Sequence, residues 1–268
     1  MLQAVDQAAA LELDGLQIYA VGRELNCGRC APDTVKELRR HIEASGLCVS
    51  AVCGDLGGHG FAIEQDNPAK VDTSKRIVDL ALELSTRVIT THIGVIPQDT
   101  TCRRYAVMQQ ACASLAEYAR SAGAVFAIET GPEKARTLRD FLDTLPQGGI
   151  GVNLDPANLV MVTDDDPVQA VHTLAPYIVH THAKDGRRLR PADPQAVYDF
   201  FAEGGIGDLR LEDYFLETPL GSGDVDFPAY LQALRQIGYD GFLTIEREVG
   251  RDPAADILHA RDFLRKYL

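Results

Sequence analysis

The sequence predicts an α/β fold, a (β/α)8 TIM barrel of parallel strands whose first strand is absent or truncated. Short apolar runs rich in β-branched residues alternate with longer segments of helical period along the 268 residues, as in repeated βα units. None of these runs leads into the GxGxxG turn that a Rossmann-type sheet carries after its first strand. The pattern therefore favours a barrel over an open, doubly wound sheet.

Seven apolar runs are predicted to be the strands of this barrel. A complete barrel has eight strands, and this chain opens instead with a helical segment at residues 3–12, which ordinarily follows strand one. Either the true start lies upstream of Met1, or the barrel has an open seam between its first and last strands. The seven runs cover residues 15–20, 47–53, 87–93, 124–130, 150–155, 178–183 and 241–247.

Two of the helices between these runs have recognisable ends. Residues 34–45 open with Thr34 and Glu37, which have the spacing of a capping box. Residues 101–122 are followed by Gly123, and glycine is the residue that most often ends a helix. Each helix then leads directly into the next apolar run, as the repeated βα units of a barrel require.

The composition excludes several classes of protein. With 26 Lys and Arg against 39 Asp and Glu, the formal net charge of −13 repels a phosphate backbone and argues against a nucleic-acid partner. No apolar stretch is long enough to cross a bilayer, and the N-terminal segment has no signal-peptide pattern. We therefore expect a cytoplasmic protein without a membrane partner, and residues 1–268 to form a single domain.

The six cysteines do not form the pattern of a disulfide framework. Cys27 and Cys30 have the spacing of a zinc or redox pair, but neither a second ligand pair nor a thioredoxin-like unit accompanies them. We interpret the pair as flanking a surface turn at Gly28.

Ligand-type side chains end four of the last five predicted strands. In such barrels the active site lies at the carboxyl ends of the strands, and the period of two places each of these side chains on the inward face. Three buried carboxylates side by side cost several kcal/mol unless a cation neutralises them. Three oxygen ligands and one imidazole suit Mn²⁺ or Mg²⁺, with Co²⁺ or Zn²⁺ as alternatives. The four residues are Glu129, Asp155, His182 and Glu246.

Other polar residues are expected around this mouth. The same parity argument points His92 toward the mouth, and the Gly-rich loop at residues 54–61 is a rim that could place His59 over a substrate, or a plain surface turn. His180 lies one layer deeper and is expected to be a hydrogen-bonded core histidine. The stretch at residues 186–218 is expected to form a lid helix and loop, whose aromatic residues could instead make a contact between subunits of a homo-oligomer.

Three motifs in order resemble a known family. They are VHTHAKD at residues 179–185, PLGSGDVDF at 219–227, and GYDGF at 238–242 leading to IERE at 245–248. The chain resembles the sugar phosphate isomerase and epimerase superfamily of xylose isomerase-like TIM barrels. The resemblance implies that Glu129, Asp155, His182 and Glu246 are metal ligands, that Glu129 and Glu246 form the acid/base pair, and that Lys184 and Arg188 contact the substrate.

The sequence departs from that family at Asn158. Many of the epimerases carry a histidine three residues after the aspartate ligand, where this chain has asparagine. An amide can hydrogen-bond a substrate hydroxyl but cannot shuttle a proton. We therefore expect Asn158 to bind the substrate without transferring a proton.

The expected activity is metal-dependent isomerisation or epimerisation of a small keto-sugar or polyol ketone. Removing a proton next to a carbonyl requires a base, stabilisation of the enediolate oxygen, and an acid that returns the proton. The same groups can expel a β-hydroxyl, so a keto-sugar or inosose dehydratase or lyase is the nearest alternative. A catalytically silent barrel subunit is the alternative outside enzymes, and the net charge of −13 with seven histidines disfavours an endonuclease IV-like phosphodiesterase.

Overall fold

The computed structural model describes residues 1–22, 25–27 and 30–268. The turn expected at Gly28 lies outside the described residues. Among the helices of these segments, none combines the length and the apolar character needed to span a bilayer.

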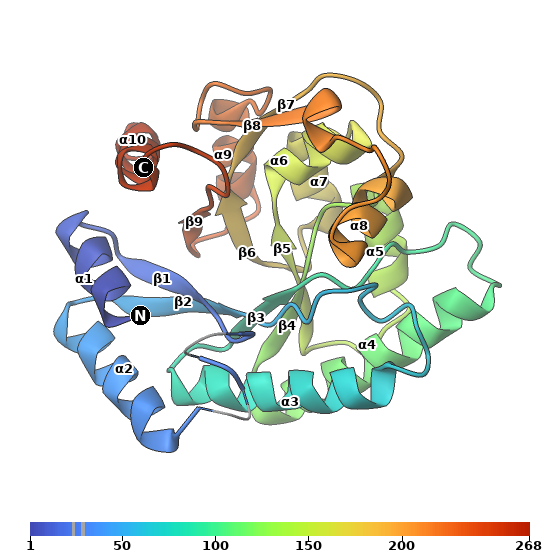
Figure 1. Ribbon diagram of the computed structural model, residues 1–268, viewed down its shortest axis with the longest axis horizontal. Coiled ribbons are helices and arrows are strands. Elements are labelled where there is room, and N and C mark those ends of the chain that lie inside the picture. Colours follow the sequence, from blue (N-terminus) through green and yellow to red (C-terminus); the bar gives the residue numbers. More distant parts are fainter. Residues whose placement is uncertain (23–24, 28–29) are drawn as a thin grey trace.

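A parallel sheet of seven strands forms the centre of the molecule (Figure 1). Its strands follow one another in chain order, and each lies within the apolar run predicted for it, so the predicted fold class is confirmed. Apolar side chains from the strands and the surrounding helices form the main core. The strands are β1 (Gly15–Tyr19), β2 (Cys48–Cys53), β3 (Val88–Thr91), β4 (Val125–Glu129), β5 (Ile150–Leu154), β6 (Ile178–Ala183) and β9 (Leu243–Ile245).

The barrel is nearly closed, with a seam between β1 and β9. In the sheet of the described residues β1 pairs with β2 and β9 pairs with β6, and no ladder joins β1 to β9. A pocket of about 480 Å³ lies along β1 and is also lined by the N-terminal helix. An open seam between the first and last strands is one of the two alternatives that the missing eighth strand left open, and the structure is compatible with both.

Helices cover the outer face of the sheet (Figure 1). The predicted end of α4 is confirmed, because Gly123 adopts the left-handed conformation with φ of 72°. The predicted capping box is wrong: α2 begins at Pro32, and its first turn has no side-chain cap. The helices are α1 (Leu2–Ala10), α2 (Pro32–Ala44), α3 (Asn67–Glu83), α4 (Arg103–Ala122), α5 (Ala135–Leu142), α6 (Pro156–Asn158), α7 (Pro167–Leu174), α9 (Phe227–Gln236) and α10 (Pro253–Leu264).

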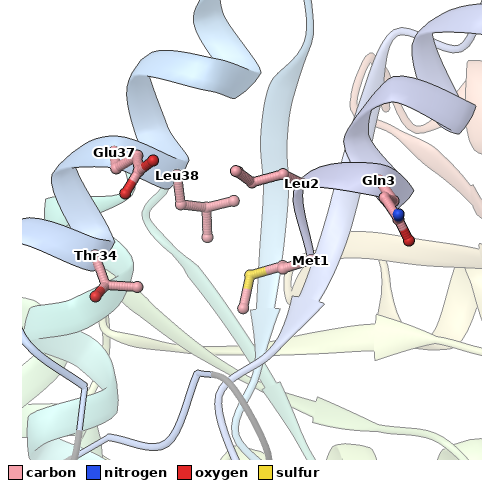
Figure 2. A pocket seen from close by; sticks show the side chains of 6 residues that line it. All are labelled: Met1, Leu2, Gln3, Thr34, Glu37 and Leu38. Atoms are coloured by element: carbon pink, nitrogen blue, oxygen red, sulfur yellow. The ribbon is translucent and has the colours of Figure 1, made fainter.

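Proline at the start of α2 explains the failure of the capping box. A proline fits the first helical turn, where its missing N–H would have no partner, so the helix starts before Thr34. Glu37 instead lines a pocket of about 330 Å³ between α1 and α2 (Figure 2). The residues of this pocket belong to these two helices and the N-terminus, and none of them is a candidate site residue.

The segment between β6 and α9 contains the expected lid helix, α8 (Pro194–Glu203), and a structure that was not predicted. Strands β7 (Asp185–Arg188) and β8 (Phe215–Thr218) pair antiparallel on either side of it. The two strands are short and only partly buried, so their sequences lack the apolar run of a core strand. Residues 159–163 form one π-helical segment, and α8 packs near it over a second, smaller apolar cluster.

The PLGSGDVDF motif folds around a single buried carboxylate. Asp185 accepts the backbone N–H groups of Gly221 and Gly223 at 2.9 Å and that of Val225 at 3.2 Å. A side chain at Gly223 would collide with Asp185, so this position requires glycine. These three hydrogen bonds hold the loop that follows β8 directly beside the end of β6.

Candidate metal centre and active site

The ends of four neighbouring strands bring the predicted ligand residues together. The strands β4, β5, β6 and β9 are adjacent and parallel, so their carboxyl ends meet at one edge of the barrel. One ligand atom from each residue lies within 4.8 Å of all the others. His182 Nδ1 lies at the centre, 3.5 Å from Glu129 Oε1, 3.3 Å from Asp155 Oδ2 and 3.2 Å from Glu246 Oε2.

Secondary hydrogen bonds orient these carboxylates. Asp155 caps α6, because its Oδ1 accepts the backbone N–H of Asn158 at 2.9 Å, and this leaves Oδ2 facing His182. Glu129 Oε2 accepts a hydrogen bond from Asn153 at 3.0 Å. Asp155 and Glu129 therefore each have one oxygen facing the common centre, while a hydrogen bond to the other oxygen fixes the orientation.

Burial and the neighbouring charges have opposite effects on the pKa values of these four groups. Burial raises the pKa of Asp155, although the neighbouring His182 and Lys184 oppose that shift. Burial also disfavours charge on His182, but the carboxylates of Glu129 and Glu246 hold its pKa well above the usual value. Despite their burial, Glu129 and Glu246 have lowered pKa values because of the positive charge on His182. The three carboxylates therefore favour a positive charge at the place that His182 Nδ1 occupies.

The donor set fits a divalent cation. Three carboxylates and one imidazole nitrogen converge, and two of the four residues, Asp155 and His182, are fully buried. Oxygen-rich sites of this kind suit Mg²⁺ and Mn²⁺, and nitrogen coordination also admits Co²⁺ and Zn²⁺. Because burying three carboxylates without a counterion is unfavourable, the cluster could hold a metal.

Three of the predicted substrate residues lie directly beside the cluster. His92 Nε2 lies 3.7 Å from Glu129 Oε1. Asn158 donates to the same carboxylate at 3.3 Å and to the carbonyl of Thr130 at 3.2 Å. Lys184 is buried and donates to Glu246 at 3.0 Å. Their roles in substrate binding stay predictions. Their positions beside the four clustered residues are those that substrate binding there would require.

The other two predicted substrate residues make contacts away from the cluster. Arg188, on β7, forms an ion pair with Asp164 at 2.5 Å. His59 binds the lid helix instead of reaching over the four ligands, with its Nε2 2.6 Å from Glu203 Oε1. The Gly-rich rim also has a packing role, because a side chain at Gly60 would meet the Ile93 backbone at 2.2 Å.

The structure adds residues that the sequence did not single out. His180 is the buried, hydrogen-bonded core histidine that was predicted, but its partner Gln17, 3.1 Å away on β1, was not. Glu133 follows β4 and is buried, which raises its pKa to about 8. The pair of Glu217 and Arg247, 2.6 Å apart, also lies beside the site. Strand parity places Gln17 on the inward face, which is a signal in the sequence, whereas Glu133 lies outside a strand and Glu217 lies on β8, a strand that was not predicted.

Residues 5–267 match the family model described as xylose isomerase-like TIM barrel. The chain belongs to this family. The resemblance to sugar isomerases and epimerases is therefore confirmed. The cluster of four lies at the carboxyl ends of the strands, where TIM-barrel enzymes have their active sites.

Two curated relatives and one solved structure are among the most similar proteins. An uncharacterized protein of Methanocaldococcus jannaschii is 24% identical over 100% of this chain and 85% of its own length. The rhizopine catabolism protein MocC of Rhizobium meliloti is 35% identical over 36% of this chain and 27% of its own length. A xylose isomerase domain protein from Planctomyces limnophilus has a TM-score of 0.79 at 25% identity, over 98% of this chain and 90% of that one.

More distant structures share the fold alone. They are a probable 3-DHS dehydratase of Bacillus anthracis, a Mycobacterium smegmatis protein in complex with magnesium, and a D-psicose 3-epimerase. Their TM-scores are 0.73 to 0.74 at 16% to 19% identity, over 98% to 100% of this chain and 87% to 93% of theirs. The comparisons support an enzyme of this superfamily, whose fold occurs with both epimerases and a dehydratase.

Proposed function

We propose that this chain is a divalent-metal-dependent enzyme that isomerises or epimerises a small keto-sugar or polyol ketone by moving a proton next to the carbonyl. The observation that carries the proposal is the convergence of Glu129, Asp155, His182 and Glu246, with ligand atoms within 4.8 Å of one another. These four would hold the ion, with Mg²⁺ or Mn²⁺ preferred. When bound, the ion would supply Lewis-acid stabilisation of a substrate oxygen.

Glu129 and Glu246 are proposed as the acid/base pair. They come from β4 and from the residue after β9, two strands separated in the sheet by β5 and β6, so they approach the mouth from different sides. Both have lowered pKa values and are ionised at neutral pH, so either can accept a proton from a substrate carbon. Lys184 donates to Glu246 and stabilises its charged form before transfer.

The neighbouring groups are proposed to bind the substrate. His92 and Asn158 border Glu129 and would hydrogen-bond substrate hydroxyls, while Lys184 borders Glu246. His59 and Arg188 would act from the rim and from the two-stranded ribbon. The proposal includes a cytoplasmic enzyme with a small-molecule substrate, which the charge of −13 supports over a nucleic-acid partner, and possible homo-oligomers through the exposed Phe201 of the lid.

Metal analysis and hydrogen exchange test this proposal. The purified protein should contain a divalent metal, and with Mn²⁺ it should exchange a carbon-bound hydrogen for deuterium in D₂O with at least one ketose or inosose of a free and phosphorylated panel. A chelator should abolish the exchange. The same assay with product analysis separates proton transfer from elimination, because a dehydratase or lyase would release water and form an unsaturated product.

Substitution of the proposed base gives the sharper test. Glu246→Gln removes the proton acceptor and should lower the exchange rate about 10³-fold, within the range for general acid/base groups. Glu43→Gln on α2, where the glutamate is exposed, is the matched control and should leave the rate unchanged. Near-full exchange by Glu246→Gln with bound metal would contradict the assigned role, and a protein with neither metal nor exchange would favour the silent subunit.

A further inference from the structure

The ring of His182 has a second polar neighbour on the side away from the carboxylates. Its Nε2 lies 3.1 Å from Gln17 Oε1, an amide oxygen on β1. The same oxygen lies 3.1 Å from His180 Nε2, which in turn lies 2.9 Å from the hydroxyl of Thr244 on β9. Side chains thus connect β1, β6 and β9 across the inner face of the seam, where β1 and β9 have no backbone ladder in the described sheet.

Metal binding by His182 imposes a requirement on that second nitrogen. Its Nδ1 faces three carboxylates, and when Nδ1 coordinates a cation through its lone pair, the ring hydrogen must reside on Nε2. A buried N–H needs an acceptor, because an unpaired one costs about 1–3 kcal/mol. The amide oxygen of Gln17 has two lone pairs and can accept from both histidines.

The other polar neighbour of this nitrogen cannot serve as the acceptor. Asn153 Nδ2 also lies 3.1 Å from His182 Nε2, but it is an amide nitrogen that donates to Glu129 at 3.0 Å. Amide nitrogens donate hydrogen bonds and do not accept them. Among the described contacts of His182 Nε2, the acceptor is therefore Gln17.

We propose that Gln17 is a positioning residue of the metal centre, which accepts the Nε2–H of His182 and so keeps Nδ1 directed at the three carboxylates. This inference rests on the proposed function only in giving the four residues a cation to bind. Gln17 touches neither a metal nor a substrate, and it acts through the orientation and hydrogen placement of a ligand. His180 on β6 contacts the amide oxygen, and Thr244 on β9 contacts His180 in turn.

Two substitutions separate this role from a packing role. Gln17→Leu keeps much of the side-chain volume but removes the acceptor, so Mn²⁺ or Co²⁺ affinity should fall by about 10- to 100-fold, the usual cost of losing such a partner. Gln17→Glu keeps an acceptor oxygen at the same reach and should retain the affinity within about threefold. Gln232→Leu, at an exposed position of α9, is the matched control.

The decisive measurement is nitrogen-15 NMR of the histidine rings together with calorimetric titration of Mn²⁺ or Co²⁺. The His182 signal is assigned by its loss in His182→Gln. The unsubstituted protein and Gln17→Glu should show a slowly exchanging hydrogen on Nε2 in the metal-free state, and Gln17→Leu should lose that signal or exchange it at least tenfold faster. Unfolding by urea establishes that each variant is folded.

The outcomes distinguish this inference from the proposed function. If the unsubstituted protein binds no cation, the proposed function fails, and the NMR signal still decides whether Gln17 accepts from His182. If Nε2 carries no hydrogen, it accepts a hydrogen bond from an amide N–H, such as that of Asn153, and the inference is overturned. Unchanged metal affinity in Gln17→Leu would overturn it as well.

Discussion

The central strands and the two strands at the seam stabilise the same site by different means. All of β5 and nearly all of β4 are buried, whereas the residues of β1 and β9 are half-buried or exposed. Glu129 is the last residue of a central strand, whereas Glu246 follows a seam strand. The candidate site therefore joins a part held by apolar burial to a part held by polar side chains.

This difference determines what fixes each ligand. At the centre, backbone ladders and close packing of apolar side chains set the strand ends, and burial of each large apolar side chain contributes about 1.5–3 kcal/mol. At the seam, Lys184 holds Glu246 at 3.0 Å, and Arg247 pairs with Glu217 at 2.6 Å and with Asp256 at 3.0 Å. Charged networks can thus position the end of a strand that, among the described residues, has a backbone ladder on one side alone.

Removal of Arg247 should produce the largest loss of stability. Its side chain is 13% exposed and that of Glu217 is 8% exposed, so Arg247→Met leaves a buried carboxylate without its closest cation. We expect a loss of about 3–5 kcal/mol in the free energy of unfolding, measured by urea denaturation. Arg210→Met, which breaks an exposed pair with Glu212, is the control and should cost under about 1 kcal/mol.

A double substitution shows whether Arg247 stabilises the protein through its charge or through the packing of its aliphatic side-chain carbons. Arg247→Met combined with Glu217→Leu removes both charges, so most of the lost stability should return. A double variant as unstable as Arg247→Met would show that the apolar contacts of Arg247 matter more than its charge. Equal losses from Arg247→Met and Arg210→Met would remove the contrast between the seam and the centre.

Glu133, which follows the central strand β4, is a buried carboxylate whose substitution should raise the stability of the protein, whereas substitution of Arg247 should lower it. The Oε2 atom of Glu133 is buried and has no hydrogen-bond partner in the described part of the chain. Burial raises its pKa to about 8, although the Ile96 backbone N–H and the charge of His92 oppose this. The folded protein therefore holds this proton more tightly than the unfolded chain, whose glutamate has a pKa of 4.5.

Stability should accordingly fall as the pH rises from about 4.5 to 8, because the native state binds more protons than the unfolded state in that window. Glu133→Gln removes this penalty. The variant should match the unsubstituted protein near pH 4 and exceed it by about 2 kcal/mol at pH 9, because relaxation and water entry limit the cost of a buried charge. Urea unfolding across this range checks the sign, and a difference that does not grow with pH would contradict it.

The sequence predicted the strands of the barrel and their ends better than the contacts of the loops and of β7. Apolar runs identify buried strands, and the period of two places Glu129, Asp155 and His182 at their inward ends, which the structure brings together. The contacts of Arg188 and His59 could not be predicted, because each pairs with an acidic residue distant in sequence, Asp164 and Glu203 respectively. Such pairings depend on loop conformation, for which no periodicity exists.

The short strands of the lid were missed for a related reason. The paired residues of β7 and β8 are largely polar, and those that are buried are not apolar, so burial leaves no apolar pattern in their sequence. The capping box failed because a proline two residues earlier started the helix first. Local signals therefore identify what is buried, and tertiary contacts decide the rest.

The smallest expected effect concerns the closure of the seam by α10. Arg265 donates to the backbone carbonyl of Glu12 at 2.8 Å, but its side chain is 48% exposed. Arg265→Met should therefore lower the free energy of unfolding by under about 1 kcal/mol. If the seam opens locally, amide hydrogen exchange should quicken in β1 and remain unchanged in β5, because β1 lies at the edge of the sheet and β5 is packed on both sides. Equal changes of protection in β1 and β5 would mean that the seam and the centre unfold as one unit. The difference between the two regions would then lie in how they position the ligand residues, and not in how the barrel opens.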